Sequence, residues 1–233
     1  MAKAREPERS RKRRIGCLPI ILVLLLMPVG GVLIHAVVPP PITLLMVQRL
    51  TEGEGLHARW RGLDDLSPDL VDAVIAAEDS RFCEHDGFDI EAIQDALEEN
   101  AEGGRIRGGS TLSQQTAKNV FLWPGRGWIR KGLEAGYTVL IEAIWPKRRI
   151  VEVYLNVAEM GPGVYGAEAA ARHWFGKSAS DLTRTEAARL AAILPNPREY
   201  QASEPGPYVR RRTRAILANM GTIRAEGLSN CIA

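Results

Sequence analysis

Apolar residues recur at helical spacing along most of this 233-residue chain, and their periodicity predicts its fold. From Ser67 onward they return every three or four positions, as in amphipathic helices with one buried face. No segment alternates apolar and polar residues for long enough to favour a strand. The pattern predicts helices at 67–78, 90–100, from 110 onward, and at 127–145, 147–156, 165–175, 187–194 and 210–220. We therefore expect an all-α domain over residues 60–222.

The segment 15–38 contains no charged residue. As a helix its 24 residues would extend about 36 Å, enough to cross a bilayer with some tilt. A basic flank precedes it, and such a flank favours a cytoplasmic N-terminus. We expect a basic cytoplasmic tail at 1–14, a transmembrane helix at 15–38, and the catalytic part on the periplasmic side of the inner membrane. A cleaved signal peptide is the alternative, but Pro39-Pro40-Pro41 stands where a small-residue cleavage site would be.

The net charge of +2 conceals an uneven distribution. Of the 30 basic and 28 acidic side chains, seven basic and two acidic lie in residues 1–14, which leaves 23 and 26 for residues 15–233. The basic charge is thus a local tail, which argues against a nucleic-acid-binding face. Residues 39–59 are typical of a stiff, polar connector, and residues 223–233 of a loose C-terminal tail. The spacing of Cys17, Cys83 and Cys231 forms no metal or disulfide framework, so unpaired thiols are expected.

Glu78 stands where the apolar pattern of its helix asks for an apolar side chain. The stripe runs through Leu70, Val71, Val74 and Ile75, and the position four after Val74 is Glu78. Burial disfavours the charged form of a carboxyl, so the pKa of Glu78 is expected to rise toward the range of a general base. A helix-end glutamate that turns toward solvent or pairs with a neighbouring arginine is the alternative.

A polar and cationic stretch follows the glycines at 108–109. Thr111, Gln115 and Lys118 share one helix face. Four cations then lie within 14 residues, ahead of a second carboxylate, Glu134; they are Lys118, Arg126, Arg130 and Lys131. Such a set can clamp a diphosphate, because arginine offers bidentate contact and lysine a point charge. A solvated helix face and a simple Arg130–Glu134 ion pair remain open as alternatives.

These stretches together resemble the ordered motifs of the peptidoglycan glycosyltransferases. The first is Glu78-Asp79-x-x-Phe82-x-x-His85-x-Gly87, and the second Gly109-Ser110-Thr111-x-x-Gln114-Gln115-x-x-Lys118-Asn119. The third is Arg130-Lys131-x-x-Glu134, and the fourth Lys147-x-x-Ile150-x-Glu152-x-Tyr154-Leu155-Asn156. Arg212 with Ile216-Leu217 resembles a weaker fifth motif. No Ser-x-x-Lys occurs, so the chain is similar to the monofunctional type without an acyltransferase module.

The resemblance implies a lysozyme-like, two-lobed helical domain behind its membrane anchor. It implies that lipid II is polymerised into β-1,4 glycan strands for the cell wall, with inversion and release of undecaprenyl diphosphate. Glu78 would be the catalytic base and Glu134 the second catalytic carboxylate, which orients the cations or a divalent Mg or Mn ion. The expected substrate-binding residues are Asp79, His85, Ser110, Gln115, Lys118, Arg126, Arg130, Lys131 and Asn156. Expected partners are lipid II, the growing lipid-linked glycan, the bilayer, and cell-division or penicillin-binding proteins.

The residue chemistry agrees with this reaction. A glycosidase needs a general acid for its alkoxide leaving group, whereas a diphosphate departs without protonation if cations take up its charge. Two other classes remain open: a lytic transglycosylase or lysozyme-type murein hydrolase, and an inactive membrane-anchored cell-wall scaffold.

Overall fold

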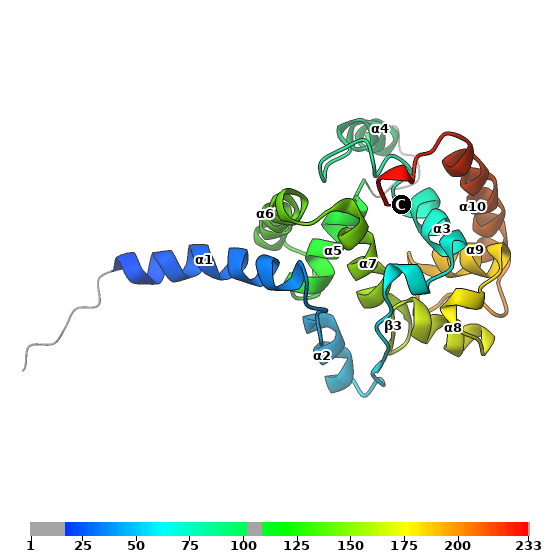
Figure 1. The fold of residues 1–233 in the computed structure, drawn as a ribbon, viewed down its shortest axis with the longest axis horizontal. Coiled ribbons are helices and arrows are strands. Elements are labelled where there is room, and N and C mark those ends of the chain that lie inside the picture. Colours follow the sequence, from blue (N-terminus) through cyan, green and yellow to red (C-terminus); the bar gives the residue numbers. More distant parts are fainter. Residues whose placement is uncertain (1–16, 102–108, 233) are drawn as a thin grey trace, which may run out of the picture.

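The computed structural model describes residues 17–101 and 109–232 and is built mainly from helices (Figure 1). The predicted tail 1–14, the first two residues of the predicted membrane segment and most of the glycine- and arginine-bearing loop before Gly109 lie outside the described residues. The helices are α1 (Cys17–His35), α2 (Leu44–Thr51), α3 (Pro68–Glu78), α4 (Ile90–Ala101), α5 (Leu112–Phe121), α6 (Trp128–Ile144), α7 (Lys147–Val157), α8 (Ala167–Phe175), α9 (Arg184–Ile193) and α10 (Pro207–Ala225).

Local capping explains where several helices begin. Pro68 occupies the first turn of α3, where a missing N–H has no consequence. Thr111 caps α5, because its side chain accepts from the backbone N–H of Gln114 and the Gln114 side chain accepts from the Thr111 N–H. Thr183 and Glu186 form the same reciprocal cap on α9, which therefore begins at Arg184, three residues earlier than predicted.

A small sheet joins the connector to the helical domain. Its strands are β1 (His57–Ala58), β2 (Glu159–Gly161) and β3 (Val164–Tyr165), in the order β1-β3-β2. β1 is parallel to β3, whereas β2 is antiparallel to it. The prediction of a helix from residue 165 was wrong at its start, since Tyr165 belongs to β3. The tight hairpin requires Gly163, whose φ is 67° and whose added Cβ would lie 2.3 Å from the Gly55 carbonyl oxygen.

Two groups of helices carry the side chains that matter below. Helix α3 packs against α9 and α10, and α5 packs against α6 and α7. One apolar core runs through both groups, and its largest fully buried members include Tyr154, Phe82, Leu70, Leu112, Ile150 and Leu190. The C-terminal end of α3 and the N-terminal half of α5 meet in this core.

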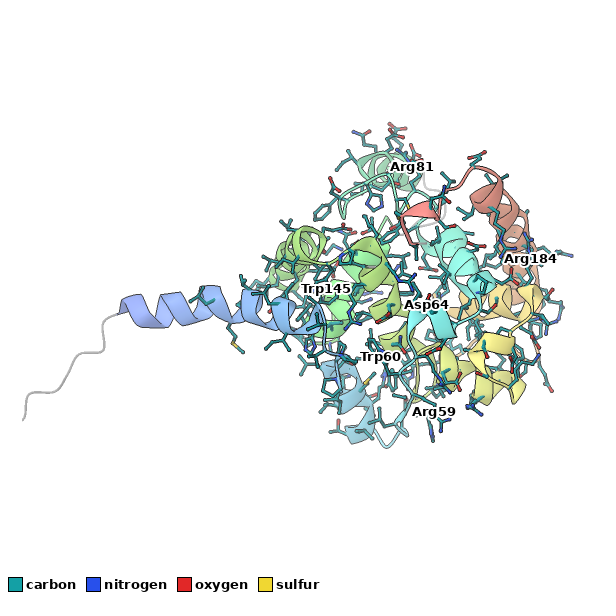
Figure 2. The ribbon with its side chains drawn as sticks, in the orientation of Figure 1. Arg59, Trp60, Asp64, Arg81, Trp145 and Arg184 are labelled. Atoms are coloured by element: carbon teal, nitrogen blue, oxygen red, sulfur yellow. A yellow bond between two sulfur atoms is a disulfide. The ribbon has the colours of Figure 1, made fainter. Side chains whose placement is uncertain are left out.

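Helix α1 extends away from the rest of the molecule (Figure 1). Its last turns dock against the domain: Val32 is buried, and the Trp145 indole donates to the Val32 carbonyl at 2.8 Å (Figure 2). Arg149 donates to the His35 carbonyl from two of its nitrogens, at 3.2 and 3.1 Å. Among the residues that the structure describes, no helix is both long and apolar enough to cross a membrane.

The C-terminal segment is ordered against the domain, which corrects two expectations. Helix α10 continues to Ala225, a 3₁₀ turn covers Asn230–Ile232, and Ile232 is buried, so the prediction of a loose tail from 223 was wrong for residues 223–232. Cys83 and Cys231 form a disulfide, so the prediction of unpaired thiols was wrong for both. They are 148 residues apart, a separation that sequence spacing could not pair. By chain entropy a crosslink of this span stabilises the fold by about 4–5 kcal/mol.

Candidate active site

Glu78 is the last residue of α3, and its carboxylate faces other side chains of the domain. Its side chain is 14% exposed. Gln115 donates to its Oε2 at 3.0 Å, and Arg212 donates to its Oε1 at 3.2 Å. Arg81, the neighbouring arginine that could have paired with Glu78, instead bonds Glu84 in the following loop and Glu91 at the start of α4. The two alternatives for Glu78, turning into solvent or pairing with Arg81, are therefore not what the structure shows.

Burial raises the pKa of Glu78, and its neighbours oppose that shift. Loss of water is the main cause, because the charged carboxylate is less stable away from solvent. The hydrogen bond from Gln115 and the positive charges of Arg212 and Lys118 lower the pKa again. The result is a carboxylate with a raised pKa and one donor on each oxygen, a suitable arrangement for a general base.

Gln115 is itself held in one orientation. The buried Tyr154 hydroxyl donates to the Gln115 Oε1 at 3.3 Å, which turns the amide nitrogen toward Glu78. Burial raises the pKa of Tyr154 well above its usual range, so the hydroxyl remains a donor. A chain of hydrogen bonds thus links α7, α5 and the end of α3.

Asp79 and His85 fasten the end of α3 to the start of α5. Asp79 Oδ2 accepts from the backbone N–H of Leu112 at 2.9 Å, and its Oδ1 lies 2.9 Å from His85 Nε2. The Gly87 N–H donates to His85 Nδ1, so the ring hydrogen is on Nε2 and points at Asp79. Both residues sit beside Glu78, where the sequence placed them, but their hydrogen bonds hold the protein's own backbone and side chains.

A second group of polar residues surrounds Glu134. This carboxylate is buried within α6 and pairs with Arg130 at 3.0 Å and with Lys131. Lys131 also donates to the Ser110 hydroxyl at 3.4 Å, which connects α6 to the start of α5. The predicted Arg130–Glu134 ion pair is therefore present, within a larger cluster of cations.

Lys118 lies on α5, three residues after Gln115, and its pKa responds to both carboxylates. Burial lowers its pKa, and the positive charges of Arg130 and Lys131 act in the same direction. Glu134 gives the largest opposing contribution and Glu78 a smaller one. Lys118 is thus electrostatically coupled both to the candidate base and to the cation cluster.

Two predicted substrate-binding residues lie apart from this set. Asn156 is buried, and its amide bonds the backbone of Arg61 at 2.8 and 2.9 Å and the Glu152 carbonyl, so it holds the segment before α3. Arg126 is exposed in the loop between α5 and α6. Their roles in substrate binding stay predictions.

Comparisons with known proteins decide the family. Residues 46–221 match the profile of the family described as Transglycosylase. The chain belongs to the transglycosylase family. A biosynthetic peptidoglycan transglycosylase of Caulobacter vibrioides is 56% identical over 216 residues, or 93% of this chain and 94% of the relative. One of Rhodospirillum centenum is 58% identical over 196 residues, covering 84% and 85%. One of Xanthomonas campestris pv. campestris is 55% identical over 221 residues, covering 92% and 90%. The resemblance read from the motifs is confirmed.

Two residues of this transglycosylase domain reach the site although the sequence did not place them there. Arg212 of α10 contacts both the Glu78 carboxylate and the Ala77 carbonyl, each at 3.2 Å. Its only sequence signal was the weak fifth motif. Tyr154 stands in the fourth motif without an assigned role, because Gln115, the partner of its hydroxyl, lies 39 positions away in the sequence.

The charge around Glu134 does not fit a divalent cation. Both of its carboxylate oxygens have cationic partners, so Mg or Mn would have to displace Arg130 or Lys131. Among the residues that the structure describes, one cluster of acidic and histidine side chains has its possible ligand atoms within 4.8 Å of one another, namely Asp79, His85 and Asp89. There His85 bonds Asp79 and Gly87, and Asp89 accepts from the Ala92 N–H at the start of α4. These contacts are structural, and we assign no step to a metal.

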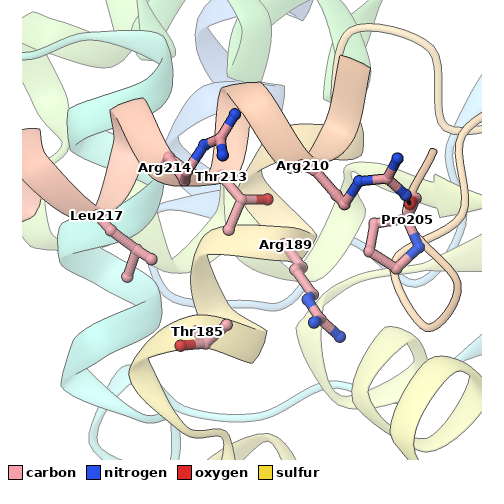
Figure 3. A pocket seen from close by; sticks show the side chains of 7 residues that line it. All are labelled: Thr185, Arg189, Pro205, Arg210, Thr213, Arg214 and Leu217. Atoms are coloured by element: carbon pink, nitrogen blue, oxygen red, sulfur yellow. Dashed lines mark hydrogen bonds between the residues drawn. The ribbon is translucent and has the colours of Figure 1, made fainter. Parts of the chain in front are cut away.

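An arginine-lined groove of about 230 Å³ lies between α9 and α10 (Figure 3). Its lining residues are Thr185, Arg189, Pro205, Arg210, Thr213, Arg214 and Leu217. On an α-helix, positions two apart differ by about 200° in direction. Arg212 therefore points away from the side that carries Arg210 and Arg214, so the groove is separate from Glu78 and its neighbours.

Proposed function

We propose that this transglycosylase polymerises lipid II into β-1,4 glycan strands for the cell wall and releases undecaprenyl diphosphate. The observation that carries the proposal is a largely buried carboxylate, Glu78, on one side of α5 and a separate cation cluster on the other: Gln115 of α5 bonds Glu78, and Lys131 of the cluster bonds Ser110 just before α5. The relatives named above are described as biosynthetic peptidoglycan transglycosylases, which supports the same activity for this chain.

Glu78 acts as the general base in this proposal. It removes the proton from the 4-hydroxyl of the acceptor sugar as that oxygen attacks the anomeric carbon of the donor. The bond from that carbon to the diphosphate oxygen breaks in the same displacement, so the configuration inverts from α to β. Gln115 and Arg212 hold the two carboxylate oxygens in place before the reaction, which reduces the reorganisation needed in the transition state.

The cation cluster takes up the charge of the departing diphosphate. Lys118 is the central member because it is partly buried, and a cation in a poorly hydrated site interacts more strongly with developing negative charge. Glu134 holds Arg130 and Lys131 on its two oxygens and so orients them. Ser110, which accepts from Lys131, completes the donor site in this proposal. Arg126, exposed in the loop between α5 and α6, would add a further cation when the diphosphate binds.

Incubation of the detergent-solubilised full chain with labelled lipid II tests the proposal. We expect a polymer that lysozyme digests. A murein hydrolase would instead release soluble fragments from purified sacculi, and a scaffold would do neither. If the protein digests sacculi and makes no polymer, the proposed polymerising activity is wrong and the lytic activity takes its place.

The pH dependence tests the contact between Arg212 and Glu78. Because the Arg212 charge lowers the pKa of Glu78, replacing it by alanine should raise that pKa further and move the acidic limb of the rate profile to higher pH. Arg212→Lys keeps the charge and should move the limb less. An acidic limb that stays in place in Arg212→Ala would show that Arg212 does not act through Glu78.

We also propose that residues 15–38 anchor the protein in the inner membrane with its domain in the periplasm. The uncharged segment and its basic flank support this topology. The Cys83–Cys231 disulfide supports it further, because such bonds persist in oxidising compartments outside the cytoplasm. The anchor would confine enzyme and lipid-linked substrate to one surface.

We propose that Trp128 contacts the bilayer interface in this arrangement. It is 94% exposed at the start of α6, the helix that packs against α1, and its neighbour Ile129 is 81% exposed. Leu122, at the end of α5, is buried and takes no part in this contact. When the full chain is reconstituted in liposomes, brominated lipids should quench part of its tryptophan fluorescence. In Trp128→Phe most of this quenching should be absent. Trp174→Phe, whose indole bonds the Met160 carbonyl, is the control, and equal losses would contradict the contact.

A further inference from the structure

The C-terminal strap, residues 224–232, contacts the helix that carries Glu78. Arg224 donates to Asp72 Oδ2 at 2.5 Å and to Asp69 Oδ1 at 2.7 Å, and both acceptors belong to α3. Ser229 donates to the other oxygen of Asp72 at 3.2 Å. Asp72 is buried and lies six residues before Glu78. The strap therefore fixes α3 on the N-terminal side of the candidate base.

The strap also holds the loop that follows Glu78. This loop, residues 79–89, runs from α3 to the start of α4, and Cys83 lies within it between Asp79 and His85. The disulfide to Cys231 holds the two Cα atoms 5.7 Å apart. The loop has noncovalent anchors as well, because Phe82 is fully buried and Lys147 donates to the His85 carbonyl.

A third contact joins the strap to α7. Arg148 donates to the Ile232 carbonyl at 2.9 Å, and the Ile232 side chain is buried in the core. The strap thus touches α3 before Glu78, the loop after Glu78, and the helix that supplies Tyr154. Each of these elements contributes a side chain to the hydrogen bonds around the base or to their support.

We propose that the strap is a positioning element for Glu78, and that the Cys83–Cys231 bond locks it in place. Without the bond, the loop keeps its anchors at Phe82 and His85 but loses its covalent tie to the strap. Asp79 then holds the start of α5 less firmly, and Gln115 meets Glu78 in its productive orientation for a smaller fraction of the time. Glu78 remains present, but fewer enzyme molecules have it correctly placed.

The lock closes only under oxidation. Its formation transfers two electrons from the two thiolates to a disulfide-bearing oxidant of the compartment, and each cysteine loses one proton. Dithiothreitol reverses this step: it returns two electrons and two protons to the Cys83–Cys231 bond and becomes a cyclic disulfide. Cys231 is exposed, so the reductant can reach the bond. The inference rests on the proposed function, because its readout is turnover.

The experiment compares the oxidised and reduced full chain in the lipid II assay, well below the unfolding midpoint of the reduced form. We expect reduction to lower kcat about tenfold with KM changed less than twofold, and reoxidation to restore it. Thiol labelling shows that the bond has opened, and circular dichroism shows that the helices persist. Cys83→Ser/Cys231→Ser should have the low kcat of the reduced enzyme and no further response to dithiothreitol.

Ser229→Ala loosens the strap while the disulfide stays closed, and it should lower kcat three- to fivefold at constant KM. Ala218→Ser, an exposed change on α10 outside the strap, is the matched control and should leave turnover unchanged. Unchanged kcat in the reduced enzyme would overturn the proposal, and so would a loss that tracks unfolding alone. If the oxidised wild type makes no polymer, it is the proposed function that fails.

Discussion

Replacing Glu78 by glutamine is expected to lower the rate of lipid II polymerisation by about 10³-fold, the scale of a lost general base. Glutamine keeps the size of the side chain, but its amide nitrogen cannot accept a hydrogen bond, so one of the two bonds from Gln115 and Arg212 is lost. Lipid II binding should change little, because the cations proposed to hold the diphosphate are untouched. Glu84→Gln is the matched control, because Glu84 is exposed in the adjoining loop and bonds Arg81. Turnover of Glu78→Gln within tenfold of the wild type would contradict the role of Glu78 as base.

The same replacement should stabilise the fold near neutral pH. Burial raises the pKa of Glu78 in the folded state above its value in the unfolded state. At pH values above both of these pKa values, the folded state therefore carries a disfavoured charge. Glutamine removes that charge, and the gain should disappear as the pH falls below about 4, where both states of the wild type are protonated. Calorimetry measures the difference, since about 1 kcal/mol moves the midpoint by roughly 2–4 °C in a domain of this size.

Replacing Lys118 by methionine should lower kcat/KM by about 10²–10³-fold, the usual effect of removing one group that stabilises transition-state charge. Methionine preserves the stem of the side chain and removes only its charge. Lys118→Met should lower kcat/KM more than Lys131→Met does, because Lys118 is the cation coupled to both carboxylates. The Lys131 side chain is 46% exposed, so solvent screens its charge.

Arg189→Met is the control for this second experiment. Arg189 lines the groove between α9 and α10, away from the candidate site, so its replacement should leave kcat/KM within twofold of the wild type. Arg148 is unsuitable as a control, because it pairs with Asp64 at 2.6 Å and donates to the Ile232 carbonyl of the strap. Equal losses in Lys118→Met and Arg189→Met would show that net charge, and not the position of Lys118, determines the rate.

The local features of the chain were readable from sequence because they depend on neighbours within one or two turns. The apolar stripe through Val74 predicted that Glu78 faces inward, and its side chain is in fact largely buried. The reciprocal cap of Thr183 predicted α9, although its boundary was placed three residues late. The spacing of Arg130 and Glu134 allowed an ion pair, which the structure contains. All of these contacts span four residues or fewer.

Contacts between distant segments could not be read in this way. Arg212 meets Glu78 across 134 positions, and Cys231 meets Cys83 across 148. Apart from the weak fifth motif, nothing in the local pattern of α10 distinguishes Arg212 from its arginine neighbours. Nor does the mixed composition of residues 223–232, in which apolar and polar residues follow no regular period, reveal that Ile232 is buried.

The sequence by itself determined the helices, their buried faces and the types of residue that the chemistry needs. Backbone periodicity, capping and side-chain spacing act within a few residues, so each is visible in a linear chain. Only the tertiary structure decided which of those residues meet: Arg212 and Gln115 on Glu78, Tyr154 behind Gln115, and the strap on α3. These meetings depend on how α3, α5, α7 and α10 pack in one core, and that packing minimises free energy over the whole chain at once.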